Sequence, residues 1–271
     1  MPIVHVQNFS YGLLNPVLGY LLSCLGAFIG LRCLTRARAY TGRGRALWLS
    51  LAAVAIGATG VWAMHFIAML GFTIPGETIL YNVPLTIISM LVAVAVVAIG
   101  LFIVGFSRSQ GLAPLLTGGV IVGLGVASMH YLGMQAMKIP DMMTYNVPLV
   151  ILSVVIAIAA GTTALYIGLR VRGIRATLGA SLLIGVAVSG MHYTGMAAMT
   201  VTASSAGVYA ASSASDGATA STFLVPLVLG IAAFTFLATI VIMLAPSEED
   251  IAADAQLAQR LAERPISHHR R

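Results

Sequence analysis

The sequence predicts an all-α integral membrane protein with seven transmembrane helices, in which one lone helix is followed by three repeated helical hairpins. Three observations predict this fold class. The 271 residues are 59% hydrophobic and only 8% charged, whereas about a quarter of the residues of a soluble domain are charged. Apolar stretches of roughly the 20 residues that cross a bilayer recur along the chain. A sequence motif also repeats on every second stretch.

The seven predicted helices are rich in Val, Ile, Leu and Ala and are separated by short polar segments. They span approximately residues 17–35, 46–71, 83–105, 113–137, 147–169, 177–199 and 223–244. The first helix is not expected to be a cleaved signal peptide, because no basic segment precedes it and Asn15-Pro16 is typical of an N-cap followed by a first-turn proline. We expect a membrane domain over residues 1–245 and a short tail over 246–271.

The arginines predict how the helices are oriented in the membrane. They follow the first, third and fifth helices: Arg32, Arg36, Arg38, Arg43, Arg45, Arg108, Arg170, Arg172 and Arg175. The opposite loops hold a single basic residue, Lys138, so the positive-inside rule places the N-terminus outside and the C-terminus in the cytoplasm. Anionic lipid headgroups account for these arginines and for the net charge of +6. We therefore expect no nucleic-acid partner.

Self-alignment finds the repeated motif three times. The strings MHFIAM, MHYLGM and MHYTGM begin at residues 64, 129 and 191, and their histidines are 65 and then 62 residues apart. This interval is one pair of helices with its loops, so the histidines are expected at equal depth, one to two turns inside the outer surface. The strings YNVPL at 81–85 and 145–149, and FLVPL at 223–227, are expected to open the third, fifth and seventh helices.

The motif residues predict a metal site. An intramembrane histidine is costly unless it has a partner, and three in register are expected to face a shared interior. A methionine four residues after each histidine lies on the same helix face. Imidazole with thioether, without cysteine or carboxylate in the motif, favours copper. The candidate ligands are His65, His130, His192, Met69, Met134, Met196, Met64, Met129 and Met191.

Packing is the alternative explanation of these residues. A single membrane histidine often hydrogen-bonds a neighbouring helix, and methionine fills gaps in apolar cores. Met64, Met129 and Met191 lie about 100° from the histidines and could line a helix interface instead. The aromatic residues that follow the histidines are expected to be interfacial aromatics, with hydrogen bonding to the site as the alternative.

The parts of the chain outside the seven predicted helices carry separate predictions. Residues 200–222 are rich in Ala, Ser, Thr and Gly and are expected to form a flexible outer loop. The tail over 247–263 is expected to form a short amphipathic surface helix. His5 could add a ligand to the metal site, although a solvated terminal histidine is the favoured interpretation. His268 and His269 are expected on the other side of the membrane.

The three strings resemble the signature of the MHYT domain family of bacterial membrane sensors, and the string at 191 matches it in full. The resemblance covers the whole membrane region. It implies a multi-pass domain of the bacterial inner membrane that coordinates copper through its methionines and histidines and senses oxygen, carbon monoxide or nitric oxide. Many relatives continue into a domain for cyclic di-GMP synthesis or hydrolysis. Because only about 27 residues follow the last helix, we expect a stand-alone sensor.

The favoured function is therefore a copper-binding sensor in the lipid bilayer that signals to an unknown cytoplasmic partner, with a diatomic gas or copper itself as the signal. Two alternatives stay open, a copper transport or delivery protein and a haem-binding membrane redox protein. The sequence has neither paired carboxylates nor an activated nucleophile, so hydrolytic catalysis is not expected.

Overall fold

The computed structural model describes residues 6–107, 111–139, 142–202, 217–244, 256–257 and 259 of the chain. Within this part, seven helices are long and apolar enough to cross a membrane, which confirms the predicted fold class. The spans are α1 (Leu14–Ala39), a composite of α2 (Gly42–Val54), η1 (Ala55–Ala63) and α3 (Met64–Met69), then α4 (Val83–Phe106), α5 (Leu112–Gln135), α6 (Val147–Arg170), α7 (Ile174–Ala198) and α8 (Val225–Leu244), the last preceded by η3 (Ala220–Leu224).

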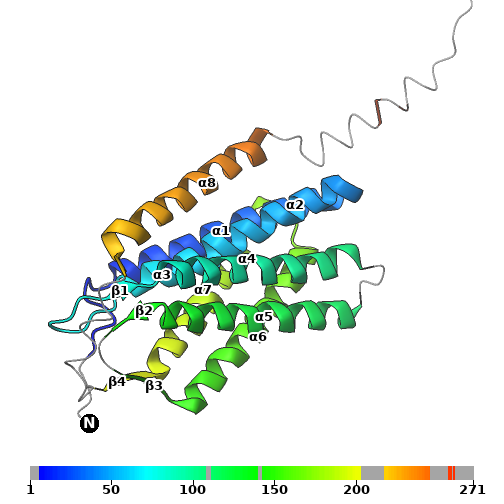
Figure 1. Ribbon diagram of the computed structural model, residues 1–271. Helices are drawn as coiled ribbons and strands as arrows, with labels where there is room; N and C mark the ends of the chain where they lie inside the picture. The colour runs from blue at the N-terminus through cyan, green and yellow to red at the C-terminus, as the bar shows by residue number, and fades with distance from the viewer. Residues whose placement is uncertain are drawn as a thin grey trace, which may run out of the picture.

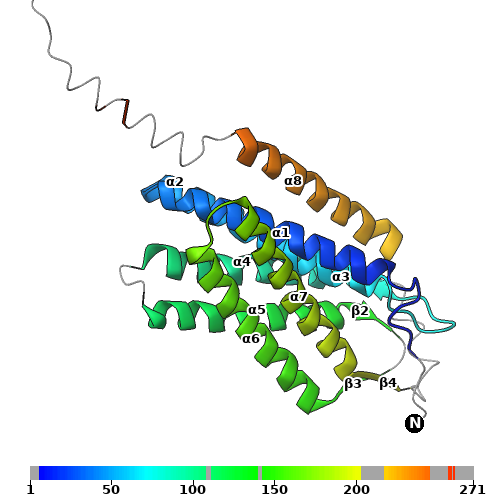
Figure 2. The same cartoon turned by 180° about the vertical axis from the view of Figure 1, so that it is seen from behind.

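The helices form a bundle in which successive spans from α1 to α7 pack side by side. α5 lies between α4 and α6, while α1 packs against α2, η1 and α7. α8 runs along the outside of α1 and η1, as the two opposite views show (Figures 1 and 2). Its outer face carries exposed apolar residues such as Leu229, Phe236 and Leu237, as expected for a helix that contacts lipid.

The repeated Asn-Val-Pro strings open helices, as predicted. The side chain of Asn82 accepts a hydrogen bond from the N–H of Leu85 at 3.0 Å, and Asn146 accepts one from Leu149 at 3.3 Å. Each asparagine satisfies a backbone donor that the first turn leaves free, and the proline in that turn needs no such partner. The same geometry at the start of α4 and α6 supports the internal repeat.

Removal of one cap is expected to destabilise the protein by about 1 kcal/mol. In Asn146→Ala the N–H of Leu149 loses its acceptor, whereas Asn146→Ser keeps an oxygen that can accept the bond. The midpoint of thermal unfolding in detergent measures the difference. If the alanine and serine variants lowered the midpoint of thermal unfolding equally, the hydrogen bond of the cap would contribute nothing to stability.

The start of α1 differs from the prediction, which was wrong about Asn15. The helix begins at Leu14, and Asn15 lies inside its first turn. The Asn15 side chain instead donates from Nδ2 to the carbonyl oxygen of Ile67 at 2.8 Å. A contact between residues 52 positions apart in the sequence thus replaces the local cap, and it ties α1 to the motif helix α3.

The second span contains a nine-residue π-helix, η1, directly before the first motif. Two of its glycines lie where neighbouring backbones come close: a Cβ at Gly57 would meet α4 at Val94, and a Cβ at Gly26 of α1 would meet Gly60. The hydroxyls of Thr59 and Thr235 are 2.8 Å apart and connect η1 to α8. Stretches of π-helix often mark functional sites because their wider turn is easily rearranged.

Short strands gather at the end of the bundle that carries the motifs (Figure 1). β1 (Leu80–Tyr81) pairs antiparallel with β2 (Met137–Lys138) and with β5 (Ala218–Thr219), while β3 (Met142–Tyr145) pairs with β4 (Met199–Thr202). The backbone N–H of Asn82 and of Asn146 donates to the carbonyl of Ala136 and of Ala198, each at 2.8 Å. Each loop is thereby fastened to the end of a motif helix.

The strands correct part of the loop prediction for residues 200–222. Residues 200–202 belong to β4, 218–219 form β5, and 220–224 form η3. Pairing with β3 and β1 orders these residues in spite of their small polar side chains. Residues 203–216 lie outside the described part of the chain. So do His5, His268 and His269, and nearly all of the predicted tail helix over 247–263.

Candidate metal centre

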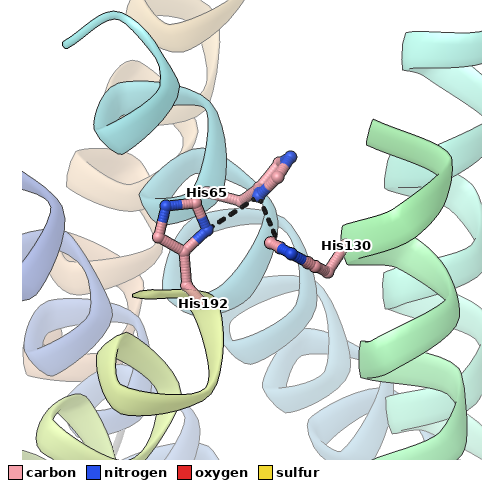
Figure 3. Close-up of side chains that lie close together, drawn as sticks. All are labelled: His65, His130 and His192. Carbon is pink, nitrogen blue, oxygen red and sulfur yellow. Dashed lines mark hydrogen bonds between the residues drawn. The ribbon is translucent and has the colours of Figure 1, made fainter. Parts of the chain in front are cut away.

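The three motif histidines converge in the interior of the bundle, one from each of α3, α5 and α7 (Figure 3). The Nδ1 atom of His65 lies 3.0 Å from that of His192 and 3.1 Å from that of His130. The three ring centroids are 4.9, 5.0 and 5.1 Å apart, and the rings are nearly perpendicular to one another. The ring centroids therefore form an almost equilateral triangle, in which Nδ1 of His65 faces Nδ1 of both other histidines.

The depth of the triangle follows from the sequence spacing. Each histidine lies within the last two turns of its helix, since α3 ends at Met69, α5 at Gln135 and α7 at Ala198. The three helices end on the same side of the bundle, so residues at equal distance from their ends meet at one level. This confirms the predicted equal depth, while the side of the membrane on which it lies stays a prediction.

Two glycines make room for the imidazoles. A Cβ at Gly133 would collide with Nε2 of His65, and a Cβ at Gly195 would collide with Nε2 of His130. Each glycine comes three residues after the histidine of its own repeat and supports the histidine of the preceding repeat. Sequence reasoning missed this role, although the glycine recurs in MHYLGM and MHYTGM. MHFIAM has Ala68 at this position.

The histidines are closed off from solvent and lack enough hydrogen-bond partners. Their exposed fractions are 0–1%, and Nε2 of both His65 and His130 is buried without a partner. A neutral imidazole has one N–H donor and one lone pair, so one proton on Nδ1 of His65 cannot satisfy two facing nitrogen atoms. A cation at the centre would accept all three lone pairs and remove this conflict.

Two of the three nitrogen–nitrogen distances are close to those of a three-histidine metal site. With metal–nitrogen bonds of about 2.0 Å, three ligands around one ion lie about 3.3–3.5 Å apart, a few tenths of an ångström more than the 3.0 and 3.1 Å from Nδ1 of His65 to Nδ1 of His192 and of His130. Small ring movements would therefore admit an ion. A haem held by two of these histidines would need the two axial nitrogen atoms roughly 4 Å apart with a porphyrin between them, which is farther than the 3.0 and 3.1 Å between the facing Nδ1 atoms.

All six candidate methionines are buried. Their exposed fractions are 5% or less, for Met64, Met69, Met129, Met134, Met191 and Met196. A Cβ added to Gly19 in α1 would lie 3.5 Å from the Cγ atom of Met64. The Met64 side chain therefore packs toward a neighbouring helix. That contact fits the interface alternative for the methionine that precedes each histidine. Sulfur ligation stays a prediction.

An aromatic ring lies edge-on to each histidine. Phe66, Tyr131 and Tyr193 have ring centroids 4.8–4.9 Å from the imidazole that precedes them in the sequence. Phe66 is fully buried, so its predicted interfacial place was wrong. The Tyr131 hydroxyl bonds Ser153 at 2.7 Å rather than a histidine. The aromatic rings thus enclose the triangle and do not hydrogen-bond to it.

The strands at the motif end of the bundle add a further buried aromatic residue. Tyr81 in β1 is 2% exposed, and its ring lies 6.1 Å from that of Phe66. Burial raises the pKa of this phenol well above its usual value, because a phenolate would lose its hydration. Tyr81 therefore stays neutral and contributes apolar cover over the site.

The chain is similar to a known family of bacterial signalling proteins. The MHYT family model, described as a bacterial signalling protein N-terminal repeat, matches residues 59–118 and 123–181. These segments contain His65 and His130, whereas His192 follows them. No solved structure matches the chain.

Three similar proteins are signalling proteins. Cyclic di-GMP phosphodiesterase NbdA of Pseudomonas aeruginosa is 38% identical over 59% of this chain and 20% of its own length. The bifunctional diguanylate cyclase/cyclic di-GMP phosphodiesterase MucR of the same organism is 33% identical over 60% of this chain and 23% of its own length. Signaling protein YkoW of Bacillus subtilis is 32% identical over 55% of this chain and 18% of its own length. The match thus covers about a fifth of each relative.

Proposed function

This chain belongs to the MHYT family of bacterial signalling proteins, and from that premise we propose that it is a sensor domain that binds one copper ion between His65, His130 and His192. The chain is a multi-pass protein of the bacterial inner membrane. The observation that carries the proposal is the cluster of three buried histidines, one ring nitrogen of each lying within 4.8 Å of the other two. The proposed role is binding and signalling, without an enzymatic step.

The choice of copper rests on softness and on charge. Imidazole binds several transition metals, but thioethers select the softer ions, and six buried methionines belong to the motif. Among the described residues the single carboxylate is Glu77, which is exposed in the loop after α3. A site made of neutral ligands in a bilayer carries the full charge of its ion. This favours Cu(I), with one positive charge, over divalent ions.

The proposed signal uses the remaining coordination position. Three protein ligands leave a tetrahedral ion one open place, which a thioether or a diatomic gas would take. α3 carries His65 and continues directly from η1, and Thr59 of η1 bonds Thr235 of α8. Ligand binding that moves α3 would therefore reach the last span, provided that the ligand binds the two helix arrangements with different affinity. The names of NbdA and MucR suggest cyclic di-GMP turnover as the output of a cytoplasmic partner.

Copper and zinc titrations of the purified protein test the proposal. We expect about one Cu(I) per chain and weaker binding of Zn²⁺. Replacement of Met69, Met134 and Met196 together by leucine is expected to weaken Cu(I) binding about tenfold, because leucine keeps the volume and removes the sulfur. The matched control replaces Met64, Met129 and Met191 in the same way and is expected to change affinity less than twofold.

Three other results of these metal-binding and uptake experiments would contradict parts of the proposal. Zinc bound more tightly than copper would contradict the choice of metal. Equal effects of the two leucine sets would contradict thioether ligation by the later methionine. Copper uptake into proteoliposomes by the unaltered protein would favour transport over sensing.

A further inference from the structure

A cavity of about 200 Å³ lies between α1, α2, α4 and α6 at the end of the bundle opposite to the strands. It is several times larger than the roughly 30 Å³ that one water molecule occupies in the liquid. Three of its lining residues are arginines, Arg38, Arg45 and Arg172, and most of the others are apolar. The metal-centre proposal does not involve this cavity.

The packing of the helix ends fixes two of these arginines. Arg38 donates to the carbonyls of Gly168 and Val171 at the end of α6. Arg45 donates to the carbonyl of Ala37 at 3.2 Å and to that of Gly105 at 3.1 Å. Carbonyls at helix ends attract cations, so these bonds hold both guanidinium groups beside the cavity. Arg172 follows α6 and is exposed at its edge.

Positive charge gathers at this end of the bundle. Eight described arginines lie here: Arg32, Arg36, Arg38, Arg43, Arg45, Arg170, Arg172 and Arg175. Three of them, Arg38, Arg45 and Arg172, line the cavity. Their guanidinium groups bring positive charge to its wall, at the boundary of the membrane-spanning segments.

We propose that this cavity binds the phosphodiester headgroup of an anionic phospholipid. Guanidinium groups match the oxygen atoms of a phosphodiester, and basic pockets between transmembrane helices suit such headgroups. The lining residues Leu49, Leu101 and Leu165 offer apolar contact to the glycerol and upper acyl chains. A free phosphate ion would gain nothing from these leucines, and this difference favours a lipid as the source of the phosphate.

Native mass spectrometry of the full chain in neutral detergent tests the proposal with phosphatidylglycerol, phosphatidylcholine and inorganic phosphate as probes. We expect phosphatidylglycerol to bind in preference to both others. Arg172→Gln is expected to weaken this binding about fivefold, as typical for one basic residue at a headgroup. The matched control is Arg170→Gln, which removes the same charge two residues away. Arg170 stacks on Tyr166 and does not line the cavity. The affinity of the Arg170→Gln variant for phosphatidylglycerol should therefore change less than twofold.

Four results would overturn the proposal. They are equal losses in the two arginine variants, equal binding of both lipids, and binding of inorganic phosphate as tight as that of phosphatidylglycerol. The fourth is lipid binding that emerges only when Glu248, Glu249 and Asp250 are neutralised in the full chain. That result would assign the cavity to an acidic segment of the same polypeptide.

Discussion

Replacement of His65, His130 and His192 together by alanine is expected to reduce bound copper from about one ion per chain to background. One ring nitrogen of each histidine lies within 4.8 Å of the other two, so the variant loses every nitrogen donor of the proposed site. Loss of a single histidine leaves two donors and is expected to weaken binding by a smaller factor. Elemental analysis of purified protein after reconstitution measures the copper.

A second measurement separates loss of the site from loss of the fold. A ligand that binds only the folded state at 100 times its dissociation constant stabilises it by about 2.7 kcal/mol. Copper should therefore raise the Tm of the unaltered protein and leave that of the triple variant unchanged. The control is His268→Ala with His269→Ala, two histidines outside the described residues, which should keep both responses. Equal copper in the triple variant and this control would refute the site.

Replacement of Gly195 by alanine is expected to damage the site without touching a ligand. The new Cβ would lie 2.3 Å from Nε2 of His130, so the imidazole must shift. Overpacking of this kind costs about 1–3 kcal/mol. Copper affinity is also expected to fall, because the shifted Nδ1 of His130 would no longer face Nδ1 of His65 as it does at 3.1 Å.

Gly190 provides a matched control on the same helix. A Cβ there meets nothing within 4 Å, so Gly190→Ala is expected to stabilise the protein by up to about 1 kcal/mol through the better helix propensity of alanine. The two substitutions are chemically identical and lie five residues apart in α7, yet they should have opposite signs in thermal unfolding. A stable Gly195→Ala protein with full copper affinity would contradict the packing argument.

The repeat explains why so much of the site could be predicted from the sequence. The nearly equal spacing of His65, His130 and His192, 65 and 62 residues, places them at one level, and their cost in a bilayer directs them inward. The helix starts at Asn82 and Asn146 were predictable for the same reason, since a cap depends on local residues.

Features that depend on distant contacts were not predictable. The π-helix over Ala55–Ala63 arises where Gly57 and Gly60 lie against α4 and α1, and no local pattern encodes those neighbours. Asn15 has the sequence context of a cap but bonds Ile67 instead. The strand pairing of residues 200–202 likewise depends on β3. Its partner residues 142–144 lie 56 to 60 positions earlier in the sequence.

The triangle takes one imidazole from each hairpin, so no single repeat contains a binding site. A single hairpin would supply only one imidazole, so the three hairpins must pack together before an ion can be held. The three contributions are not identical, since the first motif has Phe66 and Ala68 where the others have tyrosine and glycine.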